Sequence, residues 1–177
     1  MKKITLLLII LFASCETPTN GINESNANTF ETNVQTLKDG FINGYEVEDF
    51  DKVISIFADS IKYYPSGVDA KVVSGIEQMK ENISFYMANF ENAKFTEGEG
   101  LPGTDVGFWG GNTYPVSQAM SGPNSVRMYG SWSVTNSNTG KSVNFKQYCV
   151  WSFNEDGKVH TVTEYLDLGG LLSTFEE

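Results

Sequence analysis

The chain has 177 residues, of which 19% are charged, and its formal net charge is −10 at pH 7. Arg127 is its one arginine, and the lysines form no cluster, which argues against phosphate-dependent nucleic-acid binding and charge-driven attachment to an anionic membrane. The composition therefore predicts a single acidic domain with no nucleic-acid partner.

The first fifteen residues have the pattern of an export signal. Lys2 and Lys3 precede an apolar run at 4–12, which is far shorter than the roughly 20 residues that a membrane-spanning helix needs. Small residues then lead to Cys15. This resembles the lipobox of bacterial lipoproteins, although Phe12 stands where that family usually has Leu. The alternative is an ordinary signal peptide with an incidental cysteine.

The resemblance divides the chain into three parts. We expect residues 1–14 to be a signal peptide. Residues 15–29, rich in Asn, Thr and Ser, would form a lipidated Cys15 with a flexible tether, and residues 30–177 would form one domain. The lipid would be the sole membrane contact and would place the domain in the bacterial cell envelope.

Helical spacing of apolar residues predicts three helices in the first half of the domain. The first runs from an Asn28–Glu31 capping box to Gly44, the second follows Asp49, and the third follows a Ser74–Glu77 capping box.

Period-two patterns predict strands at 60–65, about 93–99, 126–135, 142–153 and 158–166, with Asp156-Gly157 as a hairpin turn. The glycine-rich segment 100–124 is too long for a passive connection, so we expect a functional loop, a lid or an extra strand there. Helices followed by a run of strands indicate an α+β domain.

Three stretches resemble the SnoaL-like branch of the nuclear-transport-factor-two-like superfamily: EDFDKVISIFADSIKYYP at 48–65, SGIEQMKENI at 74–83 and WSFNEDGKVHTVTEYLD at 151–167. The resemblance implies a cone-shaped, curved antiparallel sheet with three N-terminal helices that enclose a cavity. Members include isomerases, cyclases, dehydratases, epoxide hydrolases and proteins without known catalysis, and homodimers are common among them. The fold therefore does not name the activity.

Four residues are candidates for acid–base chemistry in such a cavity. Asp59 stands at the start of the first predicted strand and Tyr63 lies on it, and His160 and Glu164 alternate onto one face of the last. Their alternatives are an exposed turn acid, a half-buried sheet aromatic and a solvated strand histidine.

Four further residues are candidates for ligand contact. Gln147 is the one polar residue in the apolar row of the strand 143–153, so its amide needs a partner from protein, water or ligand. Trp132 and Trp151 are expected to be core residues or a pocket wall, and Tyr64 follows Tyr63 on the first strand.

Other sites are not indicated. GEGLPG at 98–103 fits G-x-G-x-x-G but precedes no predicted helix, so it is not a dinucleotide site. One histidine and the single cysteine left after lipidation, Cys149, cannot build a usual zinc shell, and we expect neither a metal nor a cofactor. Three functions stay open: binding of a small apolar or amphipathic molecule, acid–base catalysis in the same cavity, and docking of another protein on the convex face or the 100–124 loop.

Overall fold

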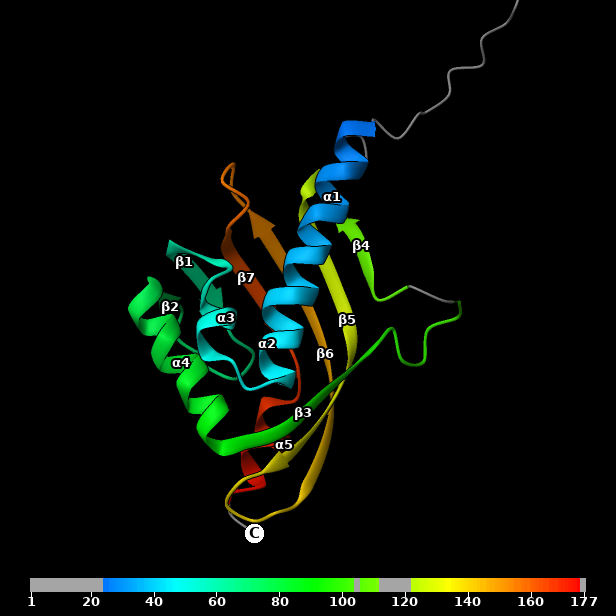
Figure 1. The fold of residues 1–177 in the computed structure, drawn as a ribbon. Coiled ribbons are helices and arrows are strands. Elements are labelled where there is room, and N and C mark those ends of the chain that lie inside the picture. The colour runs from blue at the N-terminus through cyan, green and yellow to red at the C-terminus, as the bar shows by residue number, and fades with distance from the viewer. Residues whose placement is uncertain (1–23, 104–105, 112–121, 176–177) are drawn as a thin grey trace, which may run out of the picture.

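The computed structural model describes residues 24–103, 106–111 and 122–175 (Figure 1). The predicted signal peptide and Cys15 lie outside these residues. Three segments continue one into the next at the N-terminus: helix α1 (Glu24–Thr36), a π-helical segment η1 (Leu37–Ile42) and helix α2 (Asn43–Glu46). The helix thus begins before the expected Asn28 cap, and residues 24–29, assigned above to a tether, are helical.

Gly44 does not end the first helix but lies inside α2, where the chain packs closely on the next helix. A Cβ atom at Gly44 would come within 2.5 Å of the Val53 side chain and 3.2 Å of its backbone nitrogen. Helix α3 (Phe50–Ile54) begins as predicted, because the Asp49 side chain accepts a hydrogen bond from Lys52 N at 3.0 Å. The glycine therefore serves close packing between α2 and α3.

Helix α4 (Ile76–Asn89) forms where the apolar spacing predicts it, but not with the predicted cap. Gly75 is its N-cap residue and makes no side-chain capping bond. Instead, Ser74 N donates to Gln78 Oε1 at 2.9 Å. A short helix α5 (Leu168–Ser173), capped by Asp167, was not predicted.

Among the described residues, seven strands form one sheet: β1 (Phe57–Tyr64), β2 (Val73–Ser74), β3 (Phe90–Glu97), β4 (Phe108–Gly111), β5 (Gly122–Asn136), β6 (Ser142–Phe153) and β7 (Val159–Tyr165). The order is β2-β1-β7-β6-β5-β3, and β4 also pairs with β5. Strand β4 gives the 100–124 segment the extra strand that was one of its three predicted forms; residues 104–105 and 112–121 lie outside the described residues.

One pairing departs from the expected antiparallel sheet, because β1 lies parallel to β7. The chain between them contains α4 and the other strands, which is ample for the crossover that a parallel pair needs.

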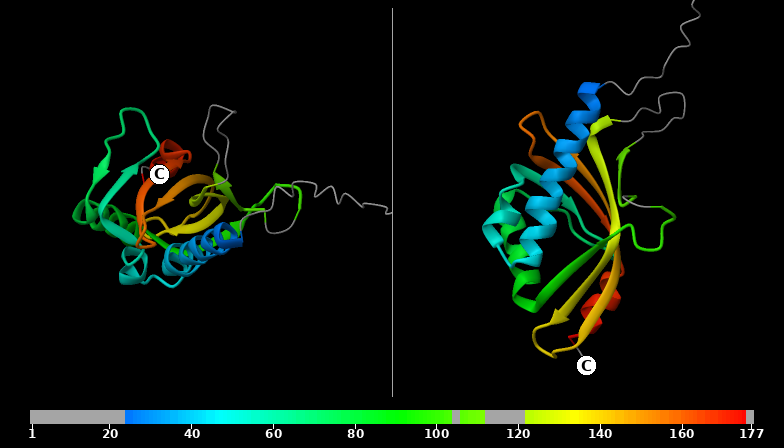
Figure 2. Two further views of the ribbon diagram at one scale, coloured as in Figure 1. Left: turned by 90° about the horizontal axis from the view of Figure 1, so that it is seen from above. Right: turned by 45° about the vertical axis from the view of Figure 1, so that its right-hand side comes forward.

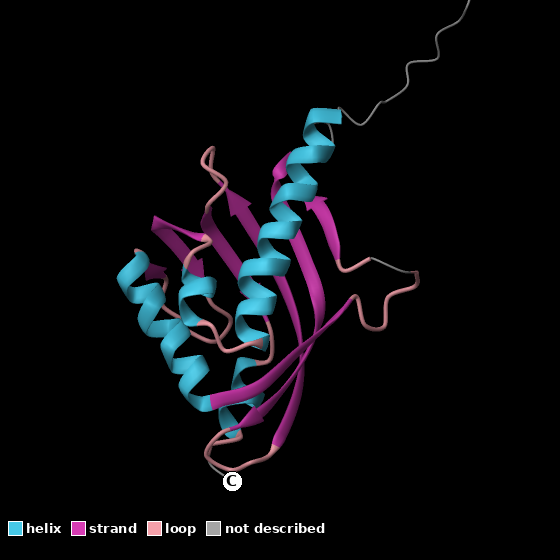
Figure 3. Ribbon diagram, in the orientation of Figure 1, coloured by secondary structure: helices cyan, strands magenta, loops and turns pink. Residues whose placement is uncertain are grey.

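Helices α1, α3 and α4 lie on one face of the curved sheet, as Figures 2 and 3 show, and α1 packs on β5 while α4 packs on β1. Burial alternates along β5 from Val126 onward and along β6, so that every second side chain there faces the helices. The α+β class with a curved, unclosed sheet is confirmed, and the space between helices and sheet holds the site described next.

Candidate functional site

A cavity of about 90 Å³ lies between the helices and the concave face of the sheet. Its lining is mostly apolar and draws on α2, α4, β1, β5, β6, β7 and the adjoining segments. Eight aromatic residues contribute: Phe41, Tyr45, Tyr63, Tyr86, Phe90, Trp132, Phe145 and Trp151. Such a concave, apolar lining with few polar groups is typical of small-molecule sites.

The register of β5, β6 and β7 brings the polar groups of the lining together. Cys149 on β6 lies directly opposite Glu164 on β7, and Gln147 lies opposite Gly130 on β5. Gly130 has no room for a side chain, since a Cβ atom there would lie 2.5 Å from the Thr96 carbonyl oxygen. The Gln147 side chain therefore has no side chain opposite it on β5, and it bonds to Trp132 and Glu164 instead.

A chain of hydrogen bonds runs across the sheet floor of the cavity. Trp132 Nε1 donates to Gln147 Oε1 at 2.8 Å, and Gln147 Nε2 donates to Glu164 Oε1 at 2.5 Å. The Tyr63 hydroxyl donates to the other carboxyl oxygen, Glu164 Oε2. Both oxygens of Glu164 are thus held by neutral donors, and the side-chain amide of the buried Gln147 bonds through both its oxygen and its nitrogen.

Burial raises the pKa of Glu164, and the hydrogen bonds from Tyr63 and Gln147 lower it only in part. An apolar environment disfavours the charged carboxylate, which is the usual cause of such a shift. The surroundings of Glu164 therefore favour the protonated form of its carboxyl group.

The neighbouring groups are held neutral by the same environment. Burial first, and the negative charge of Glu164 second, raise the pKa of Tyr45, Tyr63 and Cys149 well above their ordinary values. The same two causes raise the pKa of Tyr86 to about 12, against a hydrogen bond with Tyr63 that lowers it. These four groups stay protonated at neutral pH, so Glu164, the one carboxyl group among the five, is the group that ionises most readily.

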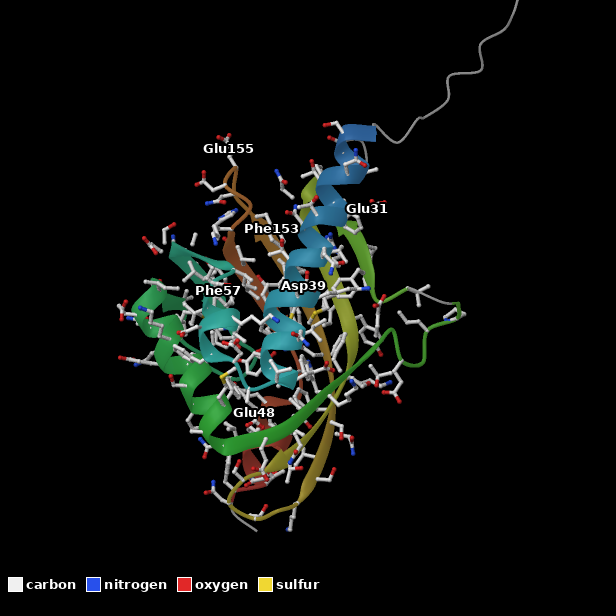
Figure 4. All side chains as sticks on the ribbon, in the orientation of Figure 1. Glu31, Asp39, Glu48, Phe57, Phe153 and Glu155 are labelled. Atoms are coloured by element: carbon white, nitrogen blue, oxygen red, sulfur yellow. The ribbon has the colours of Figure 1, made fainter. Side chains whose placement is uncertain are left out.

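Glu48 is the second carboxyl of the lining and lies at its exposed edge. It follows α2 in a left-handed backbone conformation (φ 58°), and its side chain accepts a hydrogen bond from Asn92 N at 3.3 Å. Figure 4 places it beside the junction of α4 and β3. The cavity therefore reaches the surface near this residue.

The structure brings five of the eight predicted site residues to this cavity: Tyr63, Glu164, Gln147, Trp132 and Trp151. Gln147 stood out in the sequence as the polar residue of an apolar row, and it lines the cavity. Glu164 lines the cavity together with Val162 and Leu166, the two residues with which it alternates along the last strand.

Asp59, Tyr64 and His160 lie outside the lining. Asp59 and Tyr64 are exposed. His160 is half-buried, and its Nδ1 lies 3.0 Å from Thr161 Oγ1. The assignment of His160 to the face of Glu164 is wrong, and the exposure of Asp59 agrees with its alternative reading as an exposed turn acid.

The error has a physical cause, which is a bulge in β7 where it pairs with β6. β6 pairs Trp151 with Val162 but Phe153 with Val159, so β7 carries one extra residue between the two pairs. The β1–β7 register shifts as well, between Phe57 and Lys62. A bulge reverses the alternation of faces beyond it, which strict period-two counting cannot detect.

Trp151 contributes a buried donor to the lining. Only 1% of its surface is exposed, and its Nε1 has no hydrogen-bond partner among the described residues. The Phe41 ring packs against the indole in a T-shaped arrangement with centroids 4.7 Å apart. Aromatic packing therefore positions this indole at the cavity wall.

Sequence analysis missed the lining residues that come from the helical layer. Tyr86 and Met79 follow the helical spacing of apolar residues in the third predicted helix, a pattern that does not distinguish a cavity wall from ordinary core. Tyr45, Glu48 and Asn82 carried no periodic signal. Their placement depends on how α2 and α4 sit over the sheet.

Two negative findings concern the described residues alone. Within them, no group of three or more His, Cys, Asp or Glu side chains is placed to hold a metal ion. Within the same ranges, no helix combines the length and the apolarity that crossing a membrane requires.

The fold and the enclosed cavity define the chain as a protein with the SnoaL-like, or NTF2-like, fold. Comparison with protein families and with curated proteins finds no match, but solved structures match across most of the chain.

A candidate SnoaL-like polyketide cyclase from Jannaschia sp. aligns with a TM-score of 0.59 at 14% identity, over 81% of this chain and 90% of that chain. An NTF2-like protein of unknown function from Burkholderia pseudomallei gives 0.56 at 16% identity, over 80% and 95%. A protein with a ketosteroid isomerase-like fold from Catenulispora acidiphila, in complex with trimethylamine, gives 0.53 at 10% identity, over 76% and 87%. At these identities the likeness establishes the fold alone.

Proposed function

We propose that this chain is a lipid-anchored protein of the bacterial cell envelope that binds a small, largely apolar molecule in its cavity. The observation that carries the binding proposal is Glu164, a carboxyl group set in an aromatic lining and held by Tyr63 and Gln147. A pocket with one fixed polar anchor in apolar walls orients a small ligand. Bound trimethylamine in the Catenulispora protein supports the view that this fold accommodates a small molecule.

The anchor part of the proposal rests on the sequence at Cys15. We expect that the intact chain fractionates with membranes and incorporates labelled palmitate, and that Cys15→Ser abolishes both. Unchanged membrane association of this variant would refute the anchor.

Binding is tested by filling the cavity. Ala93 lines it, and Ala93→Leu adds three carbon atoms to the wall, whereas Ala88→Leu adds the same atoms to an exposed position of α4. The methyl groups of Met79 and Met87 line the cavity, so ¹³C-methyl NMR reports occupancy directly, and the buried Met128 outside the lining is an internal control.

We expect that small cyclic ketones, alcohols and amines shift the two lining methionines in the unmodified protein and in Ala88→Leu, and that Ala93→Leu loses these shifts. Shifts that survive in Ala93→Leu would place binding elsewhere.

A second candidate is an enzyme that performs acid–base chemistry at the same site. It is favoured by the raised pKa of Glu164, which burial causes, and by the nearby hydroxyl groups of Tyr63 and Tyr86. Positioned general acids and bases contribute about 10²–10⁴-fold to rates. Deuterium exchange at the α-carbon of cyclopentanone measures such activity, which Glu164→Gln should remove and the exposed matched variant Glu81→Gln should keep. Equal exchange in both variants would remove this candidate.

Docking of a protein partner has weaker support, because it requires a filled cavity and an exposed apolar patch. The outer sheet face does carry Trp109, which is 37% exposed and stacks on Tyr148, and Tyr148 in turn packs on Tyr165. The homodimer expected from the resemblance stays a prediction, which sedimentation velocity of the purified protein would test.

A further inference from the structure

We propose that the ligand of this cavity is a small alkylammonium cation, held by the Glu164 carboxylate and by the aromatic rings around it. This inference rests on the proposed binding function and names its ligand class.

The first argument is the charge of the lining. Glu164 and Glu48 are its acidic groups, and no lysine, arginine or histidine belongs to the lining, all of which lies in the described part of the chain. The ion pairs found among the described residues leave Glu164 out, and its two hydrogen-bond donors are neutral. A buried carboxylate is stable only when a positive charge or a proton compensates it, so a cationic ligand is complementary and an anionic one is excluded.

The second argument is the chemistry of the walls. Eight aromatic side chains line the same cavity as the carboxyl group, and the faces of aromatic rings attract cations, above all the alkylated ammonium groups that aromatic cages recognise. A metal ion needs several oxygen or nitrogen ligands, and the described residues offer no such group. Methyl groups, in contrast, gain from contact with the rings and with the Met79 and Met87 side chains.

The third argument is size. The cavity of about 90 Å³ has room for roughly six water-sized groups at about 15 Å³ each. Trimethylammonium and tetramethylammonium ions fit within this limit. The acidic chain, at a net charge of −10, and Glu48 at the exposed edge raise the local concentration of cations.

Cation binding releases a proton from Glu164. In the empty cavity burial favours the protonated Glu164, and an arriving cation favours its carboxylate, so the carboxyl O–H bond breaks and the proton passes to the buffer. The other titratable groups facing Glu164 are Tyr63 from β1, Cys149 from β6, Tyr86 from α4 and Tyr45 from α2, and all have raised pKa values. They stay neutral, so the affinity for a cation should rise with pH until Glu164 is ionised in the free protein.

Three probes that share three methyl groups on one tetrahedral centre and differ in charge test the inference: tetramethylammonium, tert-butanol and pivalate, titrated against the methyl signals of Met79 and Met87. We expect tetramethylammonium to bind at least about tenfold more tightly than tert-butanol, and pivalate to give no shift. Glu164→Gln should weaken tetramethylammonium binding about tenfold or more and leave tert-butanol unchanged, whereas Glu81→Gln should alter neither.

The outcomes separate this inference from the proposed function. Equal affinity for tetramethylammonium and tert-butanol, or tighter binding of pivalate, would overturn the cation inference and leave a binding cavity. No shift with any probe would overturn both. If Glu164→Gln does not fold, two measurements on the unmodified protein still test the cation inference. They are the order of affinities for the three probes and the rise of affinity with pH, which is expected for the cation alone.

Discussion

Replacing Gln147 by leucine breaks the polar chain of the cavity at its centre. The Gln147 amide accepts from Trp132 Nε1 at 2.8 Å and donates to Glu164 Oε1 at 2.5 Å. Leucine has a similar size but neither group, so Gln147→Leu leaves one buried donor and one carboxyl oxygen without these partners.

The expected loss follows from these two groups. Each orphaned buried group costs about 1–3 kcal/mol, or about 4 kcal/mol for both. Burial of the leucine side chain returns about 2 kcal/mol. We therefore expect Gln147→Leu to lower the free energy of unfolding by about 2 kcal/mol, which an ordinary domain with about 5–15 kcal/mol of stability survives.

The loss should depend on pH. The hydrogen bond from Gln147 lowers the pKa of Glu164, so its removal raises that pKa further. A raised pKa in the folded state gives stability that is present at low pH and is lost as pH rises through that pKa. The destabilisation by Gln147→Leu should therefore be larger at pH 8 than at pH 5.

Urea unfolding followed by tryptophan fluorescence at both pH values measures this effect, with the exposed Gln35→Leu on α1 as the matched control. The control should stay within about 0.5 kcal/mol of the parent protein. A change as small as this for Gln147→Leu, equal at both pH values, would refute the hydrogen-bond chain.

Two further predictions concern stability. Because burial raises the pKa of Glu164, the parent protein should lose stability relative to Glu164→Gln as pH rises from about 4.3, the ordinary glutamate value, through the raised pKa. The difference in unfolding free energy between the parent protein and Glu81→Gln should stay constant over the same pH range. A constant difference for both variants would contradict the raised pKa of Glu164. Gly130→Ala would place a Cβ atom 2.5 Å from the Thr96 carbonyl oxygen and should lower the free energy of unfolding in urea by about 1–3 kcal/mol. Gly122→Ala, with no atom within 4 Å of its Cβ position, should change this free energy by at most about 0.5 kcal/mol. Similar values for both variants would contradict the close contact between β3 and β5 at Gly130.

The sequence predicted the parts of this fold that depend on local patterns. The apolar row of 143–153 identified the inward face of β6, and with it Gln147 and Trp151, because that strand is regular along its whole length. Asp49 was correctly predicted as a helix cap, since capping is a contact between neighbours in the chain.

The geometry of the site depends on contacts that local patterns do not encode. Tyr63 meets Glu164 only because β1 lies parallel to β7, although about a hundred residues separate the two strands. His160 was misplaced because the bulge in β7 resets the alternation of faces. Tyr45 entered the cavity through the packing of α2, which no periodicity of its own segment predicted.

The rate at which Cys149 reacts with a thiol reagent can report opening of the cavity. Its thiol is 1% exposed and lines the cavity opposite Glu164, so a thiol reagent reaches it only when the structure opens. Where Cys15 is acylated or replaced, Cys149 is the single thiol of the chain, and its rate of modification measures how often the cavity opens. A ligand that occupies the closed form slows this reaction in proportion to its occupancy. Candidate compounds can therefore be added one at a time, without any label, and ranked by how much each slows the modification of Cys149.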